Sequence, residues 1–244
     1  MRAAVLSDIH GNLPALEVVL AAIEAERPDV VWCLGDLVGY GPWPNEVTAL
    51  VRERADVCLV GNHDLVALDA AGVGVEEFNP EAAEAALWTR GELDAETRAF
   101  LESLSPQASS NGTGLYHASP RDPVWEYVLT EQGAADALAL TDAPVVLVGH
   151  THVPLAVTIE DGRVAGGLAP GGAEVELAGR RWLLNPGSVG QPRDEDPRAA
   201  WLLIDFAAGR AAFRRVPYPI ERTQADIRAG GLPEVLATRL AEGR

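Results

Sequence analysis

The sequence predicts a single α/β domain, residues 1–244, built from two packed sheets with helices on the outside. The first half of the chain alternates short apolar runs with helical stripes, which is typical of a parallel sheet covered by helices. The second half joins strand-like pieces by short turns, which favours antiparallel pairing. Hydrophobic residues make up 48% of the 244 residues, enough for a sizeable core.

The first half predicts a β-α-β-α-β unit. Buried strands are expected over residues 2–7, 30–34 and 55–60. The helix expected over residues 13–27 places leucines and Ile23 on one stripe, tolerates Pro14 in its first turn and ends before Pro28. A second helix is expected over residues 45–54. The carboxyl ends of the three strands therefore meet at one edge of a parallel sheet.

The remaining elements follow the same two patterns. Helices are expected over residues 81–90, 94–104, 130–140, 220–228 and 233–241. Strands are expected over residues 112–116, 145–148, 155–159, 174–177, 181–184, 199–206 and 211–216. Turns at Asp161-Gly162, Ala178-Gly179 and Gly209 predict hairpins, so the second half is expected to form an antiparallel-rich sheet.

Charge and cysteine content restrict the classes of partner. The formal net charge is −17, which opposes broad binding to a nucleic-acid backbone but not to a small phosphorylated substrate, because bound metal ions reverse the local field. The sequence contains no apolar run long enough for a membrane span, and its start is charged too soon for a signal peptide. Cys33 and Cys58 lie in apolar runs and are expected to be buried thiols of a cytoplasmic protein. Oligomerisation stays open.

All five histidines stand at the ends of strand-like runs: His10, His63, His117, His150 and His152. A lone histidine is usually a surface or structural residue, but five at strand ends beside carboxylates argue for a shared site. Asp8 and His10 lie two residues apart in a segment expected to be extended, so their side chains point the same way. Gly35 and Gly61 precede two of the polar clusters and allow close backbone approach or positive φ.

The number of candidate ligands predicts two metal ions. Imidazole, carboxylate and amide oxygen suit Mn²⁺, Fe²⁺ or Zn²⁺. Seven residues qualify, more than one ion needs: Asp8, His10, Asp36, Asn62, His117, His150 and His152. Two ions that share a bridging carboxylate, roughly 3.5–4 Å apart as in two-metal hydrolases, would use them all.

The motifs resemble those of the calcineurin-like metallophosphoesterases. They are Asp8-Ile9-His10, Gly35-Asp36, Gly61-Asn62-His63-Asp64, His117 and Gly149-His150-Thr151-His152, in the order of that family. Residues 7–12 and 185–190 are similar to the small bacterial and archaeal phosphodiesterase branch. The resemblance implies a four-layer αββα sandwich and hydrolysis of small phosphodiesters by a metal-bridging hydroxide.

The resemblance also implies a role for each site residue. Asp8, His10 and His152 would hold one metal, Asn62, His117 and His150 the other, and Asp36 would bridge them. Mn²⁺ is the expected metal, with Fe²⁺, Zn²⁺ or Ni²⁺ as alternatives. His63 would stabilise the phosphate and protonate the leaving oxygen, with Asp64 orienting its ring.

Several alternatives stay open. A phosphomonoesterase, either a protein phosphatase or a dinucleoside polyphosphate hydrolase, is the second interpretation; Asp64 without following arginines counts against a protein phosphatase. A nuclease is opposed by the charge, and a non-catalytic scaffold of the same fold predicts gaps in the motif set, which is complete. Arg121 is a candidate substrate clamp or a loop salt bridge, and Arg193 is equally undecided. Trp43 and Trp125 are candidates for stacking on a base of the substrate, and packing against neighbouring side chains is the alternative.

Overall fold

Two six-stranded mixed sheets form the centre of the molecule. The computed structural model describes residues 1–70, 72–160 and 162–244. The first sheet has the order β3-β2-β1-β11-β12-β9, with strands Val57–Cys58, Val30–Cys33, Arg2–Leu6, Ala199–Asp205, Arg210–Val216 and Glu174–Glu176. The second has the order β4-β5-β6-β10-β7-β8, with strands Gln107–Ser110, Thr113–Tyr116, Val145–Leu147, Trp182–Asn185, Leu155–Glu160 and Arg163–Leu168.

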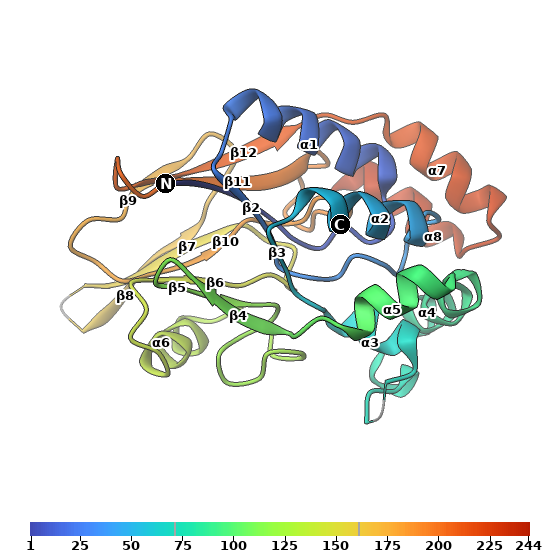
Figure 1. Cartoon of the computed structure of the whole chain (residues 1–244), viewed down its shortest axis with the longest axis horizontal. Coiled ribbons are helices and arrows are strands. Elements are labelled where there is room, and N and C mark those ends of the chain that lie inside the picture. The colour runs from blue at the N-terminus through green and yellow to red at the C-terminus, as the bar shows by residue number, and fades with distance from the viewer. Residues whose placement is uncertain (71, 161) are drawn as a thin grey trace.

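Helices cover the outer face of each sheet (Figure 1). On the first sheet these are α1 (Leu13–Glu26) and α2 (Pro44–Arg54); on the second it is α6 (Glu131–Ala139). Helix α7 (Ile220–Ala229) packs against α1. The predicted four-layer αββα sandwich is therefore confirmed. Beyond one end of the strands lie α3 (Asn62–Leu68), α4 (Pro80–Glu92), α5 (Ala95–Glu102), α8 (Glu234–Thr238) and the 3₁₀ turns η1 (Val75–Glu77) and η2 (Arg239–Glu242).

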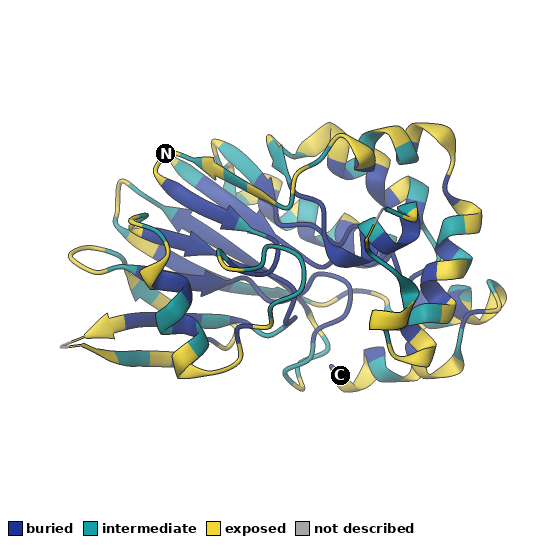
Figure 2. Cartoon of the chain, turned by 90° about the horizontal axis from the view of Figure 1, so that it is seen from below, coloured by how far each residue is buried: buried dark blue, intermediate teal, exposed yellow. Residues whose placement is uncertain are grey.

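Apolar side chains fill each space between the layers. Trp32, Leu147 and Phe213 belong to the cluster between the two sheets, and Leu16 to the cluster under α1. Leu138 fills the space between α6 and the second sheet. Figure 2 shows buried residues along the central strands and exposed residues on the outer turns of the helices. Burial of each large apolar side chain stabilises the folded state by roughly 1.5–3 kcal/mol. The sandwich is therefore a stable scaffold for the loops at its end.

The strands of the second half complete both sheets instead of forming one of their own. The β11–β12 hairpin around Gly209 is confirmed. Residues 155–159 also pair with a following strand, β8, although Asp161 of the predicted turn lies outside the described residues. The predicted hairpin of residues 174–177 with 181–184 is wrong, because β9 pairs with β12 and β10 pairs with β6 and β7.

Burial explains why β9 and β10 separate. All four residues of β10 are buried, so the strand belongs in the middle of a sheet, whereas β9 alternates exposed and half-buried residues and takes an edge. The short Ala178-Gly179 connection therefore crosses from one sheet to the other. No helix in the described parts of the chain is long and apolar enough to cross a membrane.

Candidate active site

The predicted ligands meet beyond the carboxyl ends of the parallel strands. β1, β2 and β3 run parallel in the first sheet, as β5, β6 and β10 do in the second, so the loops that follow these strands converge. Every one of the seven predicted metal ligands is at most 2% exposed: Asp8, His10, Asp36, Asn62, His117, His150 and His152. Burying so many polar groups together is costly unless they have a common partner.

The backbone at these residues is not extended, contrary to the expectation for Asp8 and His10. Their φ angles are 55° and 51°, in the left-handed region. Asp36, His150 and His152 share this conformation, with φ of 53°, 62° and 61°. Hydrogen bonds to the loop after β2 hold the first turn, including Asp8 N to Gly35 O at 3.0 Å and His10 N to Asp36 O at 3.0 Å. Such conformations cost of order 1–3 kcal/mol each for residues other than glycine and cluster at functional sites.

The donor atoms form two groups that share Asp36. One consists of Asp8, His10, Asp36 and His152, the other of Asp36, His117 and His150, and within each group the atoms lie within 4.8 Å of one another. The two oxygens of Asp36 face different groups, since Oδ2 lies 3.5 Å from His10 Nε2 and Oδ1 lies 3.7 Å from His117 Nε2. Asn62 joins the second group, with Oδ1 3.2 Å from His117 Nε2.

Backbone carbonyls fix three of the imidazoles. The Nδ1 atoms of His10, His117 and His152 lie 3.1, 2.9 and 2.6 Å from the carbonyls of Val38, Leu34 and Gln191. A carbonyl only accepts, so each Nδ1 carries the proton and each Nε2 directs a lone pair into the cluster.

Four polar atoms of the cluster have no suitable hydrogen-bond partner among the described residues. The Nε2 atoms of His10 and His152 are 3.0 Å apart, although both carry lone pairs. Asp36 Oδ2 and His150 Nε2 are buried without a hydrogen bond from any described residue. Divalent cations satisfy all of these atoms at once, so the residues fit the two predicted ions.

Burial dominates the electrostatics of the cluster. It raises the pKa of Asp8 to about 7 and that of Asp36 well above its usual range, to which the neighbouring Asp64 adds. It lowers the pKa of His150 to about 2, and it moves those of His10 and His152 well below the ordinary value. The imidazoles of His10, His150 and His152 are therefore neutral at pH 7, the form that binds a metal.

His63 lies beside this cluster, but Asp64 does not orient it. Asp64 Oδ1 accepts the N–H groups of Leu37 and Val38 at 2.9 and 3.0 Å, and Oδ2 accepts that of Gly61 at 2.9 Å. The prediction that Asp64 holds the His63 ring is therefore wrong, because its carboxylate caps α3 and ties it to the loop after β2. His63 Nδ1 is buried without a hydrogen-bond partner in the described parts of the chain.

Gly35 and Gly61 are needed for two different reasons. A Cβ on Gly61 would lie 2.0 Å from Asp36 Oδ1, so only glycine lets the two loops approach. Gly35 has a φ of 98°, which other residues adopt only with strain. The expectation for both glycines is thus confirmed.

The two undecided arginines separate clearly. Arg121 is 55% exposed and pairs with Glu126 and, at 3.3 Å, with Asp136, so the structure places it in a loop salt bridge rather than a substrate clamp. Arg193 instead lies beside the cluster, with Nη2 2.9 Å from Gln191 Oε1 and 3.4 Å from the Tyr40 hydroxyl.

Aromatic rings surround the cluster, and the sequence analysis left most of them out. Tyr40 and Phe78 cover the His63 ring, at centroid distances of 4.4 and 4.3 Å. Tyr127 covers the His150 ring at 4.0 Å. Trp125 contacts Phe78 edge-on at 5.9 Å, while Trp43 packs against the core cluster under α1. The signal available in the sequence was position, since Tyr40 and Tyr127 lie in loops that directly follow Asp36 and His117.

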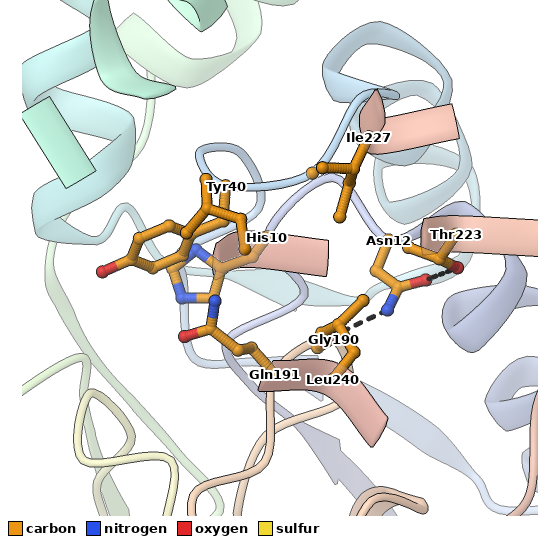
Figure 3. A pocket seen from close by; sticks show the side chains of 10 residues that line it. His10, Asn12, Tyr40, Gly190, Gln191, Thr223, Ile227 and Leu240 are labelled. Atoms are coloured by element: carbon orange, nitrogen blue, oxygen red, sulfur yellow. Dashed lines mark hydrogen bonds between the residues drawn. The ribbon is translucent and has the colours of Figure 1, made fainter. Parts of the chain in front are cut away.

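The C-terminal helices close the site from behind. A cavity of about 10 Å³ lies beside His10. Thr223 and Ile227 of α7 and Leu240 of η2 help to line it (Figure 3). Asn12 links this region to the metal cluster: its Nδ2 donates to Gly190 O at 2.8 Å, and its Oδ1 accepts from Thr223 Oγ1 at 2.9 Å. The two segments similar to the phosphodiesterase branch, residues 7–12 and 185–190, are thus bonded to each other.

Comparison with known proteins agrees with this geometry. Residues 1–208 match the calcineurin-like phosphoesterase superfamily domain. The chain is 42% identical to a metallophosphoesterase from Sphaerobacter thermophilus whose crystal structure superposes with a TM-score of 0.90, covering 100% of this chain and 99% of that one. It is 37% identical to the uncharacterized protein MJ0912 of Methanocaldococcus jannaschii over 246 residues, 99% of this chain and 98% of that protein. It is 24% identical to the phosphodiesterase YfcE of Escherichia coli over 208 residues, 81% of this chain and 84% of that protein.

The strand-end motifs, the sandwich around them and these relatives converge on one family of metal-dependent hydrolases, and the chain belongs to the calcineurin-like phosphoesterase superfamily.

Proposed function

We propose that this protein is a two-metal phosphodiesterase that hydrolyses small phosphodiesters. The observation that carries the proposal is the pair of donor groups that share Asp36, with one carboxylate oxygen toward each. Two divalent ions bound there would lower the pKa of a water molecule and neutralise phosphate oxygens. The donors are nitrogen and oxygen, without thiolate, which favours Mn²⁺ and admits Fe²⁺, Zn²⁺ or Ni²⁺.

The ligands divide between the two ions. In this proposal Asp8, His10 and His152 would hold the first ion, Asn62, His117 and His150 would hold the second, and Asp36 would be shared between them. The backbone bonds of His10, His117 and His152 orient their rings before metal arrives, which limits the entropy lost on binding.

His63 is proposed to act on the substrate. Its ring lies 4.7 Å from that of His10, close enough to reach a phosphate bound at the cluster, and its Nδ1 is free of protein partners in the described chain. Burial lowers its pKa well below the ordinary value, so the free protein presents a neutral ring that donates a hydrogen bond. Negative charge on a bound phosphate favours the protonated ring, which then gives its proton to the leaving oxygen.

Arg193 is proposed to bind a phosphate oxygen that is not in the scissile bond. Its charge acts on the whole site, since it partly offsets the rise in the pKa of Asp36 that burial causes. The loop that carries it is braced, because the buried Arg215 pairs with Asp194 and Glu195 N donates to Gly243 O at 3.0 Å. A guanidinium held in place contributes more to binding than one that must be ordered.

The test is a comparison of a diester with its monoester. With Mn²⁺ present, kcat/KM for bis-p-nitrophenyl phosphate should exceed that for p-nitrophenyl phosphate, and EDTA should abolish both activities. The reverse ranking would support a phosphomonoesterase. No hydrolysis of either ester by protein with two bound ions would support a non-catalytic scaffold.

A second candidate is hydrolysis of dinucleoside polyphosphates. Arg193 lies beside the cluster, where a guanidinium suits a substrate with more than one phosphate. Product analysis decides between the two: release of nucleoside polyphosphates from a dinucleoside tetraphosphate at a higher kcat/KM than any diester would establish the second candidate.

A further inference from the structure

We propose that the substrate carries a planar aromatic group, such as a nucleobase or an aryl ring, on the ester that is not cleaved, and that Tyr127 and Trp125 bind it by stacking. This inference rests on the proposed phosphodiesterase function and specifies its substrate class.

Tyr127 has one ring face against the metal cluster while half of the residue is exposed. Its centroid lies 4.0 Å from that of His150 with 32° between the planes, so this side of the ring covers a proposed metal ligand. Yet Tyr127 is 50% exposed, while His150 beneath it is 2% exposed. A large ring left open beside a reaction centre offers a ligand an apolar surface at a fixed distance from the metal.

A second pair of aromatic rings, Trp125 and Phe78, lies beside His63. Trp125 is half-buried and contacts Phe78 edge-on, with 69° between the planes. Phe78 stacks on His63 at 27°. Aromatic rings therefore lie next to both His63 and His150, and Trp125 is two residues from Tyr127 in the chain.

The segment that carries Trp125 and Tyr127 is fixed by polar contacts. Ser119 Oγ accepts the N–H groups of Arg121 and Asp122 at 3.1 Å each. Asp122 Oδ1 accepts those of Val124 and Trp125, also at 3.1 Å. Glu126, which stands between Trp125 and Tyr127 in the sequence, forms a salt bridge with Arg121 and so ties the aromatic segment to the start of the loop. A platform ordered before binding costs little entropy when a ring stacks on it.

The charge of the molecule favours the same substrate class. At a net charge of −17 the protein repels polyanions, so affinity for a singly charged diester must come largely from uncharged contacts and from the local cations. Arg193 lies near the platform: burial raises the pKa of Tyr127, and the Arg193 guanidinium partly offsets that rise. A phosphate on Arg193 and the metals, with its ring on Tyr127, would use both features.

The test compares two diesters with the same leaving group, the p-nitrophenyl ester of thymidine 5′-phosphate and methyl p-nitrophenyl phosphate. Their ratio of kcat/KM reports the retained group, because p-nitrophenolate leaves in both. The wild-type protein with Mn²⁺ should prefer the thymidine ester. Tyr127→Ala should lower that ratio by about five- to 150-fold, the range expected for one base–aromatic stack, and Tyr127→Phe should preserve it.

Two further variants make the result specific. Trp125→Ala should also lower the ratio, and it remains informative if Tyr127→Ala fails to fold. Leu129→Ala is the control: this residue is 63% exposed in the same segment but lines a groove beside β7 and β8, so the ratio should not change.

The outcomes separate the two proposals. A wild-type ratio near one, or a parallel loss of both activities in Tyr127→Ala and Trp125→Ala, would overturn the stacking inference and leave the phosphodiesterase function standing. Failure of the metal-loaded wild type to hydrolyse either diester would overturn the function itself.

Discussion

The two halves of the metal cluster share Asp36 but differ in their surroundings. The half with Asp8, His10 and His152 lies against residues 190–191 and the C-terminal helices, which line the cavity beside His10 (Figure 3). Backbone carbonyls fix both of its imidazoles. The half with Asn62, His117 and His150 borders the aromatic loop, where Tyr127 is half exposed.

This difference indicates that the two halves have different roles. Enclosed ligands cannot rearrange and keep a metal firmly, whereas ligands next to an open loop admit substrate. We therefore expect the ion in the enclosed half to bind more tightly and the ion beside the aromatic loop to exchange more readily. Substitutions that act on one half, on both or on neither test this expectation.

The largest effect is expected for Asp36→Ala, which removes the ligand common to both halves. Both ions should be lost and kcat/KM should fall by at least about 10⁴-fold, since metal-ion catalysis supplies several kcal/mol of transition-state stabilisation. Elemental analysis of the purified variant checks the metal content. Asp142→Ala, at an exposed position, is the matched control and should keep two ions. Full occupancy by two metals in Asp36→Ala would refute the shared carboxylate.

His63→Gln should preserve both halves and remove most turnover. His63 is not among the proposed ligands, so the variant should bind two ions, while kcat falls by ~10²–10⁴-fold as for loss of an acid catalyst. The loss should grow with the pKa of the leaving group, which a series of aryl diesters measures. An unchanged kcat with a poor leaving group would remove His63 from the mechanism.

Much of this site was predictable from the sequence because strand ends and motif order are local properties. The ring anchors were not, since His10, His117 and His152 bond to carbonyls 28, 83 and 39 residues away. The left-handed backbone at Asp8 and His10 was not predictable either, because residues other than glycine rarely adopt positive φ and carry no sequence signal for it.

Two errors came from giving weight to neighbours in sequence. Asp64 follows His63 but bonds backbone N–H groups, and the three-residue spacing from Gly61 to Asp64 was the capping signal that the sequence offered. The β9–β10 hairpin was expected from its short turn, but complete burial of β10 placed that strand inside the other sheet. A local turn pattern does not show which of two sheets a buried apolar strand will join, because burial and pairing with distant strands decide that.

Asn12→Ala should loosen only the enclosed half. Asn12 holds Gly190 beside Gln191, whose carbonyl fixes His152, so its loss frees a ligand without touching the metal. The affinity of the tighter ion should fall about 10- to 100-fold, as for other supporting residues of metal sites. Asn45→Ala is the control, because Asn45 bonds Glu92 O and Asp94 N away from the cluster. Calorimetric titration showing equal weakening of both ions would contradict the division into halves.

The smallest effect concerns the stability of the metal-free protein. Burial raises the pKa of Asp8 to about 7 and that of Asp36 well above its usual range, so the folded state holds protons that the unfolded chain releases. This contribution is complete below about pH 4 and is lost as pH rises through the folded pKa values. His10, His63, His150 and His152, whose pKa values burial lowers, act in the opposite direction, but mainly below about pH 7.5, above which the unfolded chain holds few histidine protons.

Between about pH 7.5 and pH 8.5 the carboxyl groups therefore decide the sign. The free energy of unfolding in EDTA should fall as pH rises, by up to about 1.4 kcal/mol per pH unit for each carboxyl that is still protonated, measured by urea denaturation. With saturating Mn²⁺ the fall should vanish or reverse, because metal keeps the carboxylates ionised and binds more tightly as protons leave. A metal-free protein that becomes more stable between about pH 7.5 and pH 8.5 would mean that Asp8 and Asp36 are already ionised in the empty site.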